Sequence, residues 1–143
     1  MARAPTVDGL GFLLAKASQR WNELLTQGFA ARGYVQVRAS YGSVLLPLWE
    51  QDGLRMGGLA ERARLSKQTM TTLVRLAERD GLVTRTPDRL DGRATCVWLT
   101  PLAVDLGPIA ADVVDALQAR AAATLGDCGI RSLEQSLAAL MQL

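Results

Sequence analysis

The sequence predicts a mainly helical protein with one small β-hairpin, and three observations support this fold class. Apolar residues recur at helical spacing over most of the chain. The stretch 82–99 instead contains two short strand-like segments around a turn rich in Pro, Asp and Gly. Just before this hairpin, two helical patterns are joined by a short turn. We therefore expect long helices at both ends and a helix–turn–helix followed by a hairpin between them.

Two helices are expected ahead of the central unit. Apolar residues over 10–32 fall on one helical face, and Gly33 is placed to end this helix. Ser40 is a candidate N-cap for a second helix over 40–49. Pro47 lies inside the second pattern, so this helix is expected to be short or kinked.

The central unit is expected to contain the third and fourth helices. The pattern predicts a short helix over 58–63, a turn at 64–65 and a helix over 66–80. Ser66 is well placed as the N-cap of the fourth helix and Gly81 as the residue that ends it. Four residues of the fourth helix are spaced for burial: Met70, Leu73, Val74 and Ala77.

Two strands are expected after the fourth helix, over 82–85 and 95–99, with the polar turn 87–93 between them. Thr100 and Pro101 then form an N-cap followed by a proline at the first helical position.

A long fifth helix is expected to begin there. Pro108 is expected to bend it, and Gly126 and Gly129 to break it before a sixth helix over 133–141.

The composition argues against an enzyme or a metalloprotein. The chain has no His, which removes the most frequent general base and the most common metal ligand. Its two cysteines, Cys96 and Cys128, have no metal-binding spacing. No paired-carboxylate or Gly-rich phosphate motif is present, so we expect no catalytic residues, no metal and no cofactor.

The chain is also expected to work away from membranes. No apolar run reaches the ~18 residues of a membrane span, and the first residues lack the apolar core of a secretion signal. The expected location is therefore the cytoplasm.

Positive charge is concentrated in the central unit. The chain carries a net charge of only +2, but residues 55–93 hold nine Lys and Arg against five Asp and Glu. Fourteen of the sixteen basic residues are Arg, whose planar fork suits phosphates and guanine edges. A GC-rich genome would account for the preference for Arg, but not for its clustering.

The fourth helix has a face suited to duplex DNA. Small hydroxyl groups allow close approach to the major groove, Gln68 can pair with an adenine edge, and Arg75 with guanine or phosphate. An ordinary solvated helix face is the alternative, but the acidic groups of this helix lie only at its C-terminal end. The expected DNA-binding residues of this segment are Ser66, Lys67, Gln68, Thr69, Thr71, Thr72 and Arg75.

The hairpin turn offers a second contact. Arg89 and Arg93 lie in it, and Asp91 is placed to brace the guanidinium of Arg93 so that it projects into the minor groove. A surface turn with a salt bridge is the alternative; the preceding helix–turn–helix favours a DNA-contacting wing.

These residues resemble the MarR family of winged helix-turn-helix transcription regulators. Asp91-Gly92-Arg93 followed by Leu99-Thr100 resembles the DxR…LT signature of that family. The residues that fit the family pattern upstream, in order, are Leu59-Ala60, Ser66, Leu73-Val74 and Gly81-Leu82-Val83-Thr84-Arg85.

The resemblance implies a homodimer whose terminal helices form the subunit contact. Residues 1–36 and 101–143 would form the helical dimerisation region, and residues 37–100 the winged helix-turn-helix domain. Two-fold protein symmetry would then match a pseudo-palindromic operator. The expected dimer residues are Leu10, Leu14, Val113, Leu117, Leu133, Leu137 and Leu140.

The resemblance also implies a crevice for a small aromatic or phenolic effector between the dimer helices and the winged domain. Its candidate lining residues are Trp21, Tyr41, Leu45 and Trp49; packed core aromatics are the alternative. Thiol sensing does not carry over from relatives with a Cys near the first helix, because no Cys precedes Cys96 here.

The sequence thus predicts a dimeric, sequence-specific DNA-binding regulator, most often a repressor in this family, with a small ligand as a candidate for its release. Two alternatives remain at this point. The winged helix could contact a protein instead of DNA, or the crevice could serve a small-molecule-binding protein without a DNA function.

Overall fold

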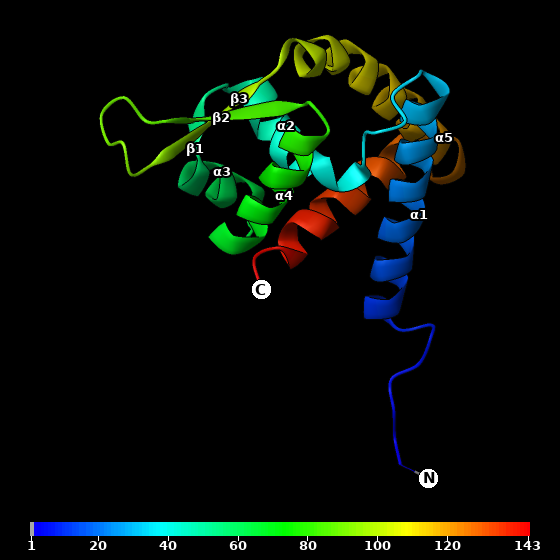
Figure 1. The fold of residues 1–143 in the computed structure, drawn as a ribbon. Helices are drawn as coiled ribbons and strands as arrows, with labels where there is room; N and C mark the ends of the chain where they lie inside the picture. Colours follow the sequence, from blue (N-terminus) through cyan, green and yellow to red (C-terminus); the bar gives the residue numbers. More distant parts are fainter. Residues whose placement is uncertain (1) are drawn as a thin grey trace.

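The computed structural model describes residues 2–143 and has a winged helix-turn-helix arrangement flanked by long helices (Figure 1). The elements follow in the order α1 (Leu10–Ala31), a 3-10 turn η1 (Ala39–Tyr41), α2 (Gly42–Glu50), β1 (Leu54–Arg55), α3 (Met56–Ala63), α4 (Lys67–Arg79), β2 (Val83–Pro87), β3 (Thr95–Leu99) and α5 (Pro101–Leu140). The mainly helical fold class with a β-hairpin wing is therefore confirmed. No helix within residues 2–143 is long and apolar enough to cross a membrane.

The sheet has three antiparallel strands in the order β1-β3-β2, one more than the sequence predicted. Leu54 of β1 pairs with Val97, and Arg55 pairs with Cys96. The side chain of Asp52 supports this edge because its Oδ1 accepts from the backbone N–H of Leu99 at 2.9 Å. A two-residue strand has no alternation to detect, which is why the sequence did not reveal it.

Gly53, which leads into β1, satisfies two requirements that other residues would not. Its φ is +71°, a backbone conformation that side-chain-bearing residues rarely adopt. A Cβ at this position would also lie 2.5 Å from the ring of Trp98. The Trp98 ring therefore packs directly on the Gly53 backbone, and its Nε1 donates to Thr86 Oγ1 at 3.0 Å.

Two expected helix starts were wrong. Ser40 lies inside the 3-10 turn and does not cap α2, which begins at Gly42 without a side-chain cap. α2 has nine residues and includes Pro47, so the expectation of a short helix is confirmed. α3 begins at Met56, two residues before the expected 58–63 segment, and Met56 is buried.

The fifth and sixth predicted helices form α5, which has a corner at Gly126. Gly126 has φ 75° and ψ 163°, the single non-helical position within α5. Gly129 lies in a helical segment, so the expected break occurs at Gly126 alone. Pro108, where a bend was expected, lies inside the helix. The segment after Gly126, orange to red in Figure 1, turns back to end beside α4. There Arg64 Nη1 donates to the Met141 carbonyl at 3.4 Å.

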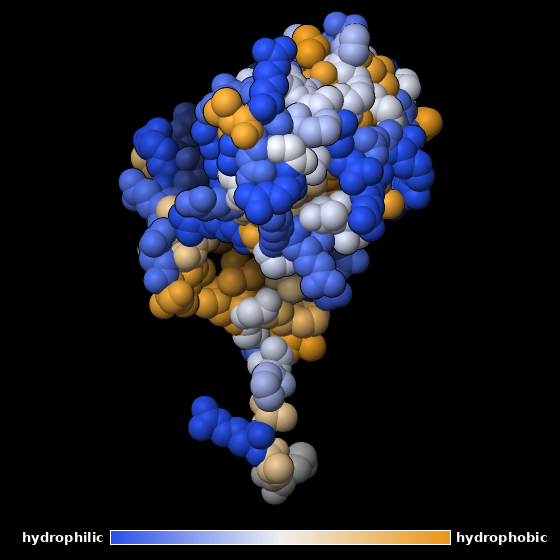
Figure 2. Space-filling model, turned by 60° about the vertical axis from the view of Figure 1, so that its left-hand side comes forward, coloured by the Kyte–Doolittle hydropathy of each residue, from blue (hydrophilic) through white to orange (hydrophobic). Residues whose placement is uncertain are grey.

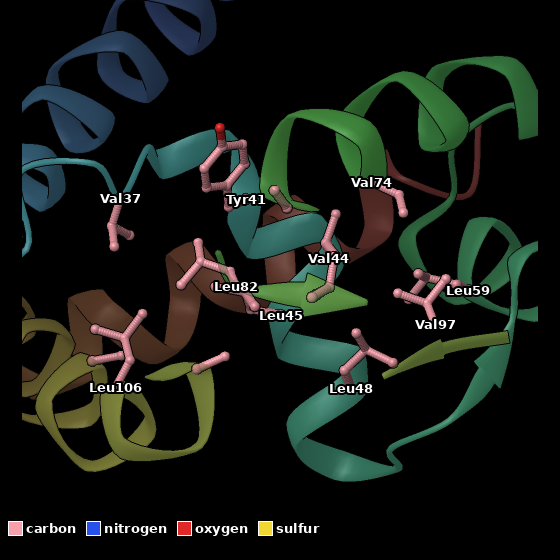
Figure 3. Close-up of a cluster of buried hydrophobic side chains, with 14 of the residues drawn as sticks. Val37, Tyr41, Val44, Leu45, Leu48, Leu59, Val74, Leu82, Val97 and Leu106 are labelled. Carbon is pink, nitrogen blue, oxygen red and sulfur yellow. The ribbon is translucent and has the colours of Figure 1, made fainter. Parts of the chain in front are cut away.

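One hydrophobic core joins the winged unit to α1 and to the first part of α5 (Figure 3). Tyr41, Leu59, Val74, Leu82, Val97 and Leu106 are fully buried members of it. Because Ala103, Leu106, Ala110 and Val113 of α5 belong to the same cluster, the first part of α5 is fixed rigidly to the winged unit.

Candidate nucleic-acid interface

The turn between α3 and α4 is held by its own backbone and by one cap. Arg64 adopts the left-handed conformation, with φ 56°, and ends α3. Ser66 then caps α4 by accepting from the backbone N–H of Thr69 at 3.1 Å, and its hydroxyl donates to Thr69 Oγ1 at 2.8 Å. This arrangement fixes the direction in which the first turn of α4 leaves the body.

α4 is amphipathic, with one face in the core and the other in solvent. Met70, Val74 and Ala77 are buried and Leu73 is half-buried, as predicted. Along the outward arc, Thr71 is half-buried, and the other expected residues are exposed: Lys67, Gln68, Thr72 and Arg75. Arg79, further along the same arc, is also exposed. Ser66 and Thr69 are exposed at the N-terminal end of the helix.

The two threonines on this arc both donate their hydroxyl protons to backbone carbonyls of α4. Thr71 Oγ1 donates to the Lys67 carbonyl at 2.8 Å, and Thr72 Oγ1 to the Gln68 carbonyl at 3.2 Å. Their outward lone pairs therefore remain available as acceptors. Within residues 2–143, the side chains of Lys67, Gln68 and Arg75 have no hydrogen-bond or ion-pair partner, so their donors are available to a ligand.

Two other arginines near α4 form ion pairs within the chain. Arg79 pairs with Asp80 at 3.4 Å, and Arg85 pairs with Glu78 at 3.0 Å. The C-terminal end of α4 is therefore neutralised by its own carboxylates, whereas its N-terminal half presents uncompensated positive charge.

The loop between β2 and β3 projects away from the helices (Figure 1). Arg93 is 93% exposed, and its Nε donates to Asp91 Oδ1 at 3.2 Å. The same carboxylate oxygen accepts from the backbone N–H of Arg93 at 3.1 Å. The predicted brace between Asp91 and Arg93 is thus present, and Arg89 is exposed on the same loop.

Sequence reasoning missed a further residue of this loop, Asp88. Its carboxylate accepts from the backbone N–H groups of Leu90, at 2.7 Å, and Asp91, at 3.4 Å. It also accepts from Arg55 Nε on β1. A Pro-Asp pair opening a turn is a known signal for such capping, but the Arg55 contact depends on the undetected strand β1.

An apolar cavity of about 360 Å³ lies between α1, α2 and α5, and it contains half of the expected ligand-binding residues. Leu45 and Trp49 line it. Tyr41 does not, because it is fully buried in the core, and Trp21 lies on α1 outside the cavity wall. The α5 wall is built from small residues, among them Gly107, Ala110 and Ala111.

The expected dimer residues divide into two groups. Leu10, Leu14, Leu133 and Leu137 are exposed, and Leu140 is half-buried. Val113 and Leu117 are buried within the single chain, so they belong to its own core rather than to a face left for a partner. Helical spacing reports an apolar face but does not show which element covers it.

The fold, the basic outward face of α4 and the wing loop together define the class of protein. It has a winged helix-turn-helix with a basic second helix and a braced wing. Residues 43–94 match the family model described as MarR family.

Individual relatives agree with this classification. A 57-residue segment, 40% of the chain, is 40% identical to the HTH-type transcriptional regulator TtmR of Methylorubrum extorquens (strain PA1) and spans 29% of that protein's length. A probable transcriptional regulator from Pseudomonas aeruginosa superposes with a TM-score of 0.81 at 25% identity, covering 93% of this chain and 97% of that one.

A third relative shows likeness of fold alone. The repressor CouR, solved bound to a 23-mer DNA duplex, superposes with a TM-score of 0.80 at 23% identity, covering 97% of this chain and 99% of that one. CouR from Rhodococcus jostii RHA1 has also been solved bound to p-coumaroyl-CoA.

Proposed function

We propose that the protein is a homodimeric, sequence-specific double-stranded DNA-binding repressor that acts on a pseudo-palindromic operator and is released by a small aromatic ligand. The observation that carries the DNA-binding part is the outward face of α4. Lys67, Gln68 and Arg75 present unpartnered donors there, whereas Arg79 and Arg85 are neutralised within the chain. An ordinary solvated helix face carries both acidic and basic residues, whereas the N-terminal half of α4 has no carboxylate.

The wing supports the same proposal. In the proposed complex, the N-terminal half of α4 enters the major groove and Arg93, braced by Asp91, reaches the adjacent minor groove. Ser66 and Thr69 lie at the end of α4 that approaches the phosphates first. Thr71, Thr72 and Arg89 complete the proposed contact surface.

The unpartnered apolar residues support the homodimer. Hydrophobic residues gather at the end of the molecule next to the N-terminal segment, whereas much of the remaining face is hydrophilic (Figure 2). Large apolar side chains are exposed on both α1 and the last part of α5, including Leu10, Leu13, Leu133 and Leu137. Exposed apolar surface of this extent marks a protein contact, and we assign it to a second copy of the chain.

Assigning the apolar surface to a second copy divides the chain into two proposed regions. Residues 1–36 and 101–143 form the proposed dimerisation region, and residues 37–100 the proposed DNA-binding domain. The shared core means that the first part of α5 belongs physically to both. A shift of α5 would therefore move the winged unit with it.

The cavity supports release by a ligand. Its volume of about 360 Å³ is within the range of small-molecule sites. Its walls are largely apolar, with Arg38 and Asp115 as the charged residues of the lining. It lies between α1, α2 and α5, so a ligand that fits only one arrangement of α1 against the unit formed by α2 and α5 would shift the DNA-binding equilibrium.

Selection of bound sequences from random duplex DNA, at near-physiological salt, tests the proposal. An inverted repeat with half-sites about one helical turn apart is the expected result. Sequence-blind binding would exclude a specific operator. Binding of aromatic carboxylates with no salt-dependent DNA affinity would favour a small-molecule-binding protein, and neither activity would favour a winged helix that contacts protein.

A further inference from the structure

Asp88 stands at the point where the wing loop leaves the sheet. Its side chain is only 10% exposed, although it lies in a polar loop. Three kinds of donor converge on its carboxylate: two backbone N–H groups of the loop, the guanidinium of Arg55, and the thiol of Cys96 at 3.7 Å.

These contacts determine the shape of the loop. The Asp88 carboxylate fixes the backbone at Leu90 and Asp91, two and three residues further on. The loop is closed by the Asp88 N–H, which donates to the Ala94 carbonyl at 2.9 Å, and by the Ala94 N–H, which donates to the Asp91 carbonyl at 2.9 Å. Asp91 in turn holds Arg93. Asp88 therefore orders the residue that braces the exposed arginine.

Arg55 anchors this arrangement to the sheet. It lies on the edge strand β1, whose partner is β3, and its side chain is half exposed. Because its Nε donates to Asp88, Arg55 ties the wing loop to the strand farthest from β2. The pKa of the Asp88 carboxyl is lowered, mainly by the Leu90 N–H and then by Arg55, so the carboxylate remains charged.

The loop holds its tip residues outward. Leu90 is 93% exposed although its backbone N–H is fixed by Asp88. Arg93 is equally exposed although its side chain is held by Asp91. The Leu90 backbone and the Arg93 side chain have therefore lost conformational entropy without gaining a core contact. Such an arrangement lowers the entropic cost of binding.

We propose that Asp88, anchored by Arg55, is a positioning residue for DNA binding that acts through Arg93. It sets the loop so that Arg93 enters the minor groove, between the phosphates that line it, in one geometry. This inference rests on the proposed DNA-binding function. It assigns to Asp88 and Arg55 no contact with DNA of their own.

A double-mutant cycle tests the inference. The binding of the full-length protein to its selected duplex is measured for wild type, D88A, R93A and D88A/R93A over a range of salt concentrations. D88A is expected to weaken binding about tenfold, and to reduce the salt slope by about 0.9, the value for one phosphate contact. The double variant is expected to bind no more weakly than R93A. R55A is expected to resemble D88A, although it removes a positive charge instead of a negative one.

The matched control is E78A. Like D88A, it removes one carboxylate charge and one ion pair with an arginine, here Arg85, but it leaves the wing loop intact. General electrostatics predicts that both variants bind DNA more tightly. Positioning predicts tighter or unchanged binding for E78A and weaker binding for D88A. Amide hydrogen exchange at Leu90 and Asp91, measured without DNA, is expected to accelerate in D88A alone.

Each outcome is decisive. Additive losses in the double variant, or equal effects of D88A and E78A, overturn the positioning role while leaving the DNA-binding proposal in place. Wild-type protein that binds no duplex overturns the proposed function, and the positioning role with it. Accelerated exchange with unchanged DNA affinity shows that Asp88 orders the loop only for structural reasons, and this also overturns the inference.

Discussion

The hydroxyl of Tyr41, the buried last residue of the turn η1, donates a hydrogen bond to the carboxylate of Asp80, the residue that caps the C-terminus of α4. The two residues are 39 positions apart in the chain. Gly42, directly after Tyr41, and Ala39, two residues before it, line the apolar cavity. This single bond thus connects the wall of the proposed ligand site to the end of the proposed recognition helix.

Tyr41→Phe is expected to lower the free energy of unfolding by about 1 kcal/mol, because one hydrogen bond is lost while the ring still fills the core. Urea denaturation at one fixed protein concentration measures the change, since the stability of the proposed dimer would depend on concentration. Tyr34→Phe is the matched control, because the half-buried Tyr34 hydroxyl has no side-chain partner within residues 2–143. Equal effects of the two substitutions would contradict the role of the bond.

The same bond predicts a pH dependence. The pKa of Asp80 is lowered from its ordinary value of 3.8, chiefly because the Tyr41 hydroxyl donates to its carboxylate. A lowered folded-state pKa stabilises the protein above the unfolded value, and this contribution is lost as the pH falls through the folded value. The stability difference between wild type and Tyr41→Phe should therefore be full at pH 7 and shrink below about pH 4. A difference that grows under acid conditions would contradict this assignment.

Gln68→Ala is expected to relax base preference at a single operator position, by about 1–3 kcal/mol, if Gln68 pairs with a base edge. Competition binding against operators altered one base pair at a time measures this loss of base preference. Gln36→Ala, outside α4 and the wing, is the control. A uniform loss of affinity over all positions would instead mean that Gln68 contacts only the DNA backbone.

Leu137→Lys is expected to shift the protein toward monomer, because it places a charge in the exposed apolar stripe of the last helical segment. Light scattering coupled to size exclusion gives the mass directly. Leu90→Lys makes the same chemical change at an exposed leucine of the wing loop and should leave the mass unchanged. If both variants remain dimeric, a different surface forms the subunit contact.

The two cysteines should react at different rates with iodoacetamide at neutral pH. Burial raises the pKa of the Cys96 thiol, and the neighbouring Asp88 carboxylate adds to the shift. Cys128 is exposed. Because the thiolate is the nucleophile, Cys96 should be alkylated several-fold more slowly, as measured by peptide mass spectrometry over time. Faster labelling of Cys96 would show that the wing loop opens and exposes it.

Most of the helices could be predicted because their signals are local. Ser66, Thr100, Gly33 and Gly81 act within a few residues of where they stand, as caps or as helix ends. The strand β1 could not be predicted, because two residues acquire a strand conformation only by pairing with β3. Ser40 was misassigned because a capping residue type does not by itself start a helix.

The candidate site was predictable to the extent that it lies on one helix face or one turn. The arc of α4 and the Asp91–Arg93 brace follow from spacing alone. The contact between Asp88 and Arg55 requires knowing that β1 lies beside the wing. Apolar spacing alone cannot distinguish a residue of the core from one of a cavity wall or of a subunit contact. For this reason the expected ligand-site residue Tyr41 and the expected dimer residues Val113 and Leu117 were found buried within the single chain.

Gly126 adopts a backbone conformation that allows the chain to change direction within α5. Its φ of 75° and ψ of 163° lie in a region essentially restricted to glycine. Nothing stands within 4 Å of where its Cβ would be, so the constraint is torsional and not steric. With any other residue, a straight α5 would be favoured, a rod of about 60 Å for its 40 residues. The last segment would then point away from Arg64, and the architecture of the assembled molecule would change through one backbone torsion.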